Sequence, residues 1–220
     1  MAGPAFRAAA VRVRTPASSA NLGPGFDAFG LALGLYDDVV VRVADSGLAT
    51  EIEGHPDNVA ACLLGGFTLS WMEGGLARAV RMTPADSVVP VVFVPGRPVL
   101  TETARGLLPR TVPHPDAAAN AGRAALLVEA LTRRPGLLLA ATEDRLHQEY
   151  RGPAMPESLA LVERLRADGV PAVISGAGPT VLALVDEEAA DKVAGLAGEE
   201  WAAARIPVDT AGASVLPLAP

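Results

Sequence analysis

The sequence contains very little lysine, and this scarcity limits the kinds of enzyme it can encode. Of its 18 basic residues only Lys192 is a lysine, and the rest are arginines. A P-loop ATPase needs a lysine directly after its glycine-rich loop, and a protein kinase needs one on a strand. Lys192 lies instead in an acidic, alanine-rich stretch near the C-terminus. The composition therefore excludes these two large classes of phosphoryl-transfer enzyme.

Cysteine, excess positive charge and long apolar runs are also scarce. A single cysteine, Cys62, excludes an internal disulfide and a cysteine-based zinc site, and it suits a reducing compartment. The net charge of −7 argues against a dedicated nucleic-acid binder, which needs a basic face. The longest uncharged run, Gly169–Val185, contains two prolines and is too short to span a bilayer. We expect a cytoplasmic protein with no nucleic-acid or membrane partner.

Hydrophobic residues make up 50% of the chain, which is enough for a sizeable core in 220 residues. Periodicity and turn signals predict strands and helices mixed without a regular βαβ alternation, which favours an α+β fold. A serine- and glycine-rich stretch over Thr15–Phe26 predicts an ordered loop. The predicted strands are Val11–Arg14, Gly30–Tyr36, Asp38–Val43, Phe67–Trp71, Arg78–Met82, Val88–Val94, Val170–Ser175, Thr180–Val185 and Ser214–Leu216. The predicted helices are Asp57–Leu64, Ala117–Leu131, Leu137–Gln148, Glu157–Ala167 and Glu187–Ala204.

The first segment that could carry chemistry is PASSANLGPGFD, residues 16–27. It joins two strands through a loop whose two glycines and central proline hold the backbone in a specific shape. Asn21 and Asp27 are the polar groups fixed near that turn. Taken alone, an Asx turn at Asn21 and a helix cap at Asp27 would explain both residues without any function.

Two further segments place polar or small residues beside apolar elements. The segment EGHPDN, residues 53–58, brings a carboxylate, an imidazole and an amide to the start of an apolar helix, where free N–H groups favour anions. The segment SGAGPT, residues 175–180, joins two apolar strands through small residues that allow close approach of a backbone or a ligand. Taken alone, residues 53–58 are explained equally well as a helix cap, and residues 175–180 as a tight turn.

Together the three segments are more specific than any one of them. They resemble the homoserine kinase branch of the GHMP small-molecule kinases, and the resemblance runs from about Val11 to about Val185. Intervening sequence also fits that branch, including ARGLLP around Arg105 and HQEYR ending at Arg151. The resemblance implies an incomplete N-terminal part like the second domain of ribosomal protein S5, residues 1–82, and a ferredoxin-like C-terminal domain, residues 83–220.

The resemblance also implies an activity, which is ATP-dependent phosphorylation of the side-chain hydroxyl of L-homoserine, a step toward threonine. It implies substrate contacts by Asn21, Asp27, His55, Asn58, Arg105 and Arg151, with Asn58 and Arg105 also serving catalysis. An ammonium group is best bound by a carboxylate, here Asp27, and a carboxylate by a forked guanidinium.

Cofactor residues follow from the same resemblance. ATP would contact the glycine turn at Gly176 and Gly178, and Mg²⁺ would be held by Glu53, with Glu51 as the alternative. Homodimers are plausible in this family.

One part of the family pattern is absent from this sequence. Homoserine kinases carry a stretch on the order of 80 residues, the size of a small domain, between the second strand region and the EGHPDN segment. That stretch includes the phosphate loop P-x-x-x-G-L-G-S-S, which the 220 residues do not contain. The N–H groups of such a loop cradle the ATP phosphates. We therefore expect a retained homoserine pocket with little or no kinase activity, or a non-catalytic amino-acid-binding remnant.

Overall fold

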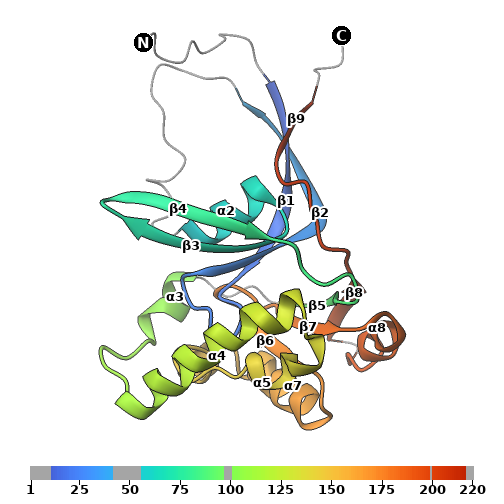
Figure 1. Ribbon diagram of the computed structural model, residues 1–220. Helices are drawn as coiled ribbons and strands as arrows, with labels where there is room; N and C mark the ends of the chain where they lie inside the picture. Colours follow the sequence, from blue (N-terminus) through green and yellow to red (C-terminus); the bar gives the residue numbers. More distant parts are fainter. Residues whose placement is uncertain (1–10, 42–55, 97–100, 199, 217–220) are drawn as a thin grey trace.

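The computed structural model describes residues 11–41, 56–96, 101–198 and 200–216, which form two antiparallel sheets with helices packed around them (Figure 1). The first sheet has the strand order β4-β3-β2-β1-β9, and the second has the order β6-β7-β5-β8. The strands of the first sheet are β1 (Val11–Ala20), β2 (Phe29–Val41), β3 (Phe67–Glu73), β4 (Leu76–Met82) and β9 (Ser214–Leu216). The second sheet is built from β5 (Val89–Pro95), β6 (Ala172–Ile174), β7 (Val181–Val185) and β8 (Trp201–Arg205).

One short helix packs on the first sheet and fixes the residues that follow Pro56. Helix α2 (Pro56–Leu64) begins with a proline and an aspartate and is followed by Gly65, whose φ of +70° suits glycine. It lies against β1, β2 and β3. A Cβ on Gly30 would come within 2.5 Å of the Asp57 carbonyl oxygen, so only glycine allows the helix to approach β2 this closely.

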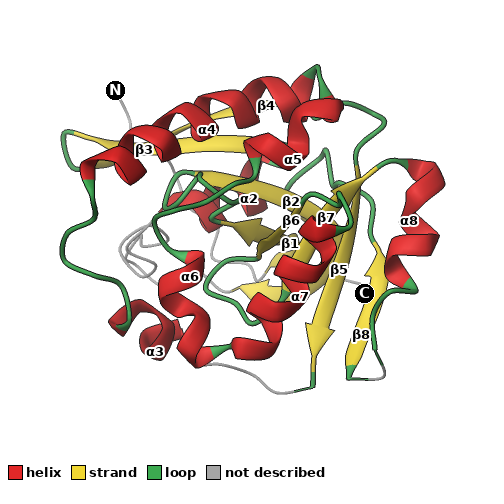
Figure 2. Cartoon of the chain, turned by 90° about the horizontal axis from the view of Figure 1, so that it is seen from below, coloured by secondary structure: helices red, strands yellow, loops and turns green. Residues whose placement is uncertain are grey.

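The remaining helices lie around the second sheet, as the view from below shows (Figure 2). They are α3 (Thr101–Gly106), α4 (His114–Thr132), α5 (Leu138–Ala141), α6 (Gln148–Arg151), α7 (Pro156–Ala167) and α8 (Glu187–Ala194), with short 3-10 turns at Pro135–Leu137 and Gly152–Ala154. None of the helices in these described parts of the chain is long and apolar enough to cross a bilayer.

The second sheet is buried on both faces, and this links the two halves of the chain. Alternate residues of its strands point to opposite sides, as pleating requires. Val92, Val173 and Leu182 pack with α4 and with the first sheet, including Phe67. Phe93, Ile174 and Val181 pack in a second cluster with α7 and α8. Because one cluster contains side chains from both sheets, the loop between β1 and β2 is held firmly against the second half.

The structure corrects several predicted boundaries. Thr15–Ala20, predicted as loop, continues strand β1 and pairs with β2, with a bulge between Pro16 and Ala17. The predicted helix over Glu187–Ala204 was wrong in its second part: α8 ends at Ala194, and β8 follows from Trp201. The predicted helix over Leu137–Gln148 is interrupted, because the carboxylate of Asp144 accepts the N–H groups of Leu146, His147 and Gln148 and starts a new turn there.

The proposed division after residue 82 remains a prediction. Strand β5 begins the second sheet at Val89, which agrees with a boundary in this region. However, the chain returns to the first sheet at its end, where Val215 of β9 pairs with Val13 of β1.

Candidate functional site

The C-terminal end of β1 gathers most of the predicted site. Three consecutive residues there contact two other segments. The Ser18 hydroxyl donates to Asn58 Oδ1 at 2.8 Å, the Ser19 and Ser175 hydroxyls lie 2.8 Å apart, and Ala20 O accepts the Gly176 N–H at 2.8 Å. These contacts bring the start of α2 and the glycine turn after β6 to the same strand end. The three motifs recognised in the sequence therefore meet in space.

Asn21 and Asp27 shape the loop that follows β1. Both adopt a left-handed backbone conformation, with φ values of +55° and +52°, which asparagine and aspartate tolerate better than other non-glycine residues. The Asp27 N–H donates to Asn21 Oδ1 at 2.8 Å, and Asn21 is only 6% exposed. This bond spans six residues, so it is not the Asx turn considered for Asn21, whose partner would lie two residues on; its effect is to fix the backbone of Asp27.

Arg151 lies in the interior of this site. Its side chain is 1% exposed, its Nη1 donates to Gly176 O at 3.1 Å, and its guanidinium lies 5.2 Å from the centre of the Phe26 ring. Its Nε is buried and has no hydrogen-bond partner among the described residues. A buried cation with an unsatisfied N–H is costly unless a ligand supplies the acceptor.

Several charged side chains lie close enough to Arg151 to shift the pKa of its guanidinium. Burial lowers the pKa of the Arg151 guanidinium, the carboxylate of Asp27 opposes that fall, and Arg105 adds to it. Arg105 is exposed at the end of α3, which Figure 2 shows next to α6. Two carboxylates, Asp27 and Asp144, and two guanidinium groups thus share a small region, and such an arrangement can bind the ammonium and carboxylate ends of an amino acid.

Sequence reasoning missed two residues beside Arg151, which are His147 and Phe26. His147, directly before α6, is fully buried, and its ring stacks on that of Phe26 with 5.1 Å between the ring centres. Burial is the main reason that the pKa of His147 is lowered, and Asp144 partly opposes the shift. The spacing of four residues between His147 and Arg151 on one short helical turn was the signal that could have linked them.

The geometry bears on the predicted ATP residues, whereas the predicted metal residues stay a prediction. The Gly176 and Gly178 N–H groups donate to Ala20 O and Ser175 O, so neither points freely toward a phosphate. As they stand, these glycines do not fit a phosphate cradle. His55, Glu53 and Glu51 lie outside the described residues. Within the described ranges no group of three or more His, Cys, Asp or Glu side chains could hold a metal ion.

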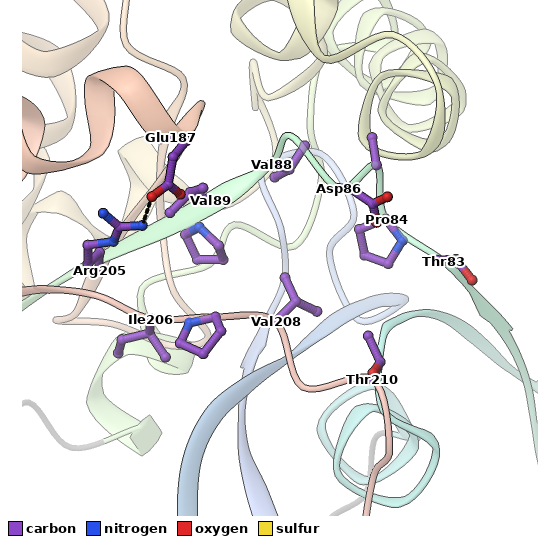
Figure 3. Close-up of a pocket in the computed structure, with 13 residues that line it drawn as sticks. Thr83, Pro84, Asp86, Val88, Val89, Glu187, Arg205, Ile206, Val208 and Thr210 are labelled. Atoms are coloured by element: carbon purple, nitrogen blue, oxygen red, sulfur yellow. Dashed lines mark hydrogen bonds and ion pairs between the residues drawn. The ribbon is translucent and has the colours of Figure 1, made fainter.

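A separate cavity of about 330 Å³ lies between the segment before β5 and the segment after β8 (Figure 3). Pro84, Val88, Ile206 and Val208 supply much of its wall, and the ion pair of Arg205 with Glu187 lies at one side. Among the described residues, none of the predicted site residues lines it. The charged cluster, not this cavity, holds groups suited to an amino-acid ligand.

The chain is similar to known proteins over its whole length. Residues 117–202 match the family described as GHMP kinases C terminal. The homoserine kinase of Streptomyces avermitilis is 63% identical over 304 aligned positions that cover all of both chains, and that of Streptomyces coelicolor is 60% identical over 304 positions that cover all of this chain and 98% of the relative. A crystal structure of homoserine kinase from Cytophaga hutchinsonii superposes with a TM-score of 0.79 at 20% identity, covering 98% of this chain and all of that one.

The alignments also bear on the missing stretch. The 304 aligned positions exceed the 220 residues of this chain, so each Streptomyces relative has residues at positions where this chain has none. The expected α+β architecture is confirmed as the GHMP kinase fold. With these matches, the chain belongs to the homoserine kinase family of the GHMP kinases.

Proposed function

We propose that this chain binds L-homoserine at the cluster of Asp27, Arg105 and Arg151, and that its reaction is phosphorylation of the homoserine side-chain hydroxyl by ATP. Arg151 carries the proposal: a guanidinium that is 1% exposed, with an Nε lacking a partner among the described residues, calls for an anionic ligand group. A homoserine carboxylate supplies that group. The nearby Asp27 carboxylate suits the homoserine ammonium.

Asn58, at the same end of β1, fits a second role in this site. It lies in the first turn of α2, half-buried, with its Oδ1 engaged by Ser18. That hydrogen bond fixes the Asn58 carbonyl oxygen. Because the oxygen and the NH₂ group of an amide lie in one plane, the direction of the two amide N–H groups is fixed as well. We propose that this amide orients the homoserine side chain, in keeping with phosphoryl transfer that relies on positioning and charge neutralisation.

We expect turnover well below that of a relative that carries the phosphate loop. The sequence lacks the pattern P-x-x-x-G-L-G-S-S, and the glycine turn at residues 176–178 already uses its N–H groups internally. The nucleotide phosphates therefore have a weaker anchor in this chain. This observation favours a second candidate function, which is binding of homoserine without turnover.

Two measurements test these proposals. Calorimetry should show binding of L-homoserine to the wild-type chain, and Asp27→Asn should weaken that binding about tenfold or more, because a charge-assisted contact is lost. Asp37→Asn, an exposed aspartate on β2, is the matched control and should bind like wild type. Absence of homoserine binding by the folded wild-type chain would refute the substrate assignment.

A coupled assay of ADP release in the presence of L-homoserine separates the two candidate functions. Turnover that depends on homoserine, even at a low rate, supports the kinase. Homoserine binding with no ADP release and no binding of Mg-ATP supports the non-catalytic binding protein. Turnover equal to that of the Streptomyces avermitilis relative would contradict our reasoning about the phosphate loop.

A further inference from the structure

The protonation state of His147 can be read from its two ring contacts. Its Nε2 lies 2.7 Å from Gly23 O, and a carbonyl oxygen only accepts, so Nε2 carries a proton. Its Nδ1 lies 3.3 Å from Arg151 Nη1, and a guanidinium only donates, so Nδ1 is bare. The neutral imidazole with the proton on Nε2 satisfies both contacts at once.

The surroundings of His147 favour this neutral form. Desolvation in the interior lowers the pKa of His147, and the neighbouring Arg151 charge acts in the same direction. Asp144 and Asp27 oppose the shift but do not reverse it. The Asp144 carboxylate, 3.6 Å from Nε2 at one oxygen, is already engaged by three backbone N–H groups at the start of α6.

The same contacts restrain Arg151. Its Nη1 is shared between His147 Nδ1 and Gly176 O, and its guanidinium lies over the Phe26 ring, which in turn stacks on His147. A long arginine side chain has several rotatable bonds, so these contacts reduce its freedom before any ligand arrives. The buried Nε is left without a partner among the described residues.

We propose that His147 is a positioning residue: it connects the Gly23 backbone to Arg151 and holds the guanidinium so that Nε can donate to an anionic ligand group. This proposal rests on the proposed function, under which that group is the homoserine carboxylate. His147 does not touch the ligand in this scheme. It acts through Arg151: His147 Nδ1 accepts an N–H from Nη1, and the Nε–H stays available for the ligand.

Two substitutions of His147 separate positioning from simple packing. His147→Phe keeps the ring and its stacking on Phe26 but removes both nitrogen atoms. His147→Gln offers one N–H donor and one carbonyl acceptor on a flexible chain, so it can retain part of the link. His114→Phe changes an exposed histidine at the start of α4 and is the matched control.

Homoserine calorimetry gives the first readout. A hydrogen bond to a charged group contributes about 1.5–3 kcal/mol, so we expect His147→Phe to weaken homoserine binding about 10- to 100-fold. His147→Gln should recover part of that loss, and His114→Phe should bind like wild type. Equal binding by wild type and His147→Phe would overturn the proposal, as would equal weakening in the Phe and Gln variants.

Nuclear magnetic resonance without ligand gives the second readout, which a packing role alone would not move. At pH 7.5 the ¹⁵N shifts of the His147 ring should show a protonated Nε2 and a bare Nδ1. The Arg151 Nε–H signal, assigned by its loss in Arg151→Lys, should shift in His147→Phe and stay near its wild-type position in His147→Gln. A protonated Nδ1, or an Arg151 signal unaffected by His147→Phe, would overturn the proposal.

The two readouts also separate this proposal from the substrate assignment. If the folded wild-type chain binds no homoserine, the proposed function fails. The resonance measurements then still decide whether His147 holds Arg151, because they need no ligand.

Discussion

Asn21 should stabilise the loop before Asp27 in two separable ways, through its side-chain hydrogen bond and through its tolerance of positive φ. Its Oδ1 accepts the Asp27 N–H at 2.8 Å, and its own φ is +55°. Asn21→Gly removes the hydrogen bond but keeps a residue suited to that φ. Asn21→Ala removes the hydrogen bond and also places a Cβ in the left-handed region.

The expected magnitudes follow from these two terms. A largely buried hydrogen bond contributes about 1 kcal/mol, and glycine adds about 0.4–1 kcal/mol of unfolded-state freedom, so Asn21→Gly should lower the free energy of unfolding by about 1–2 kcal/mol. For alanine the left-handed backbone costs about 1–2 kcal/mol, so Asn21→Ala should lower it by about 2–3 kcal/mol. Gly74→Ala is a control for the backbone cost alone, because Gly74 has a φ of +58° and no atom lies within 4 Å of its Cβ position.

Urea unfolding followed by circular dichroism and tryptophan fluorescence measures these changes. Trp71 reports on the first sheet and Trp201 on the second, so coincident transitions justify a two-state treatment. Homoserine calorimetry on both Asn21 variants should show weaker binding, because the Asp27 carboxylate is no longer held in place. If Asn21→Gly is as stable as wild type, or the Gly and Ala variants unfold at the same urea concentration while Gly74→Ala is destabilised, our account of this loop is refuted.

Three further predictions concern contacts elsewhere in the fold. Gly30→Ala should destabilise the chain by about 1–3 kcal/mol in the same urea assay, since its Cβ would meet the Asp57 carbonyl oxygen at 2.5 Å, and unchanged stability would mean that α2 packs farther from β2 than described. Arg151→Lys should weaken homoserine binding at least about tenfold by calorimetry, because one ammonium cannot reproduce the guanidinium fork, and binding like wild type would contradict that role. The hydrogen bond from Arg14 lowers the pKa of the exposed Asp38, so the pair's favourable contribution is present above the usual aspartate value of about 4 and is lost as pH falls through the lowered pKa. Resonance titration should give Asp38 a low midpoint that Arg14→Gln returns toward that usual value, and an unchanged midpoint would argue against the contact.

The sequence alone determined the family and most of the fold's elements. The motifs around Asn21, Asn58 and Gly176 identified the family because each combines small, rigid and polar residues in an order that chance does not produce. Helix α2 and the β3–β4 hairpin were predictable because proline, aspartate and paired glycines mark their ends locally. Strands β5 and β7 were predictable because both are continuously apolar, which is typical of strands buried on both faces.

Other features depended on contacts between distant residues, and only the tertiary structure decided them. Thr15–Ala20 reads as loop from its serines and proline, but pairing with β2 makes it a strand. The segment over Trp201–Arg205 is alanine-rich and favours a helix locally, but hydrogen bonding to β5 makes it a strand as well.

His147 is the clearest case of a role that its neighbours in sequence do not reveal. Nothing close to it along the chain shows that Gly23, 124 positions earlier, supplies the carbonyl oxygen that fixes its proton. The sequence therefore identified most of the residues that form the site. Their burial, their protonation and the availability of the Arg151 Nε were decided by packing, because each depends on which groups the folded chain excludes from water.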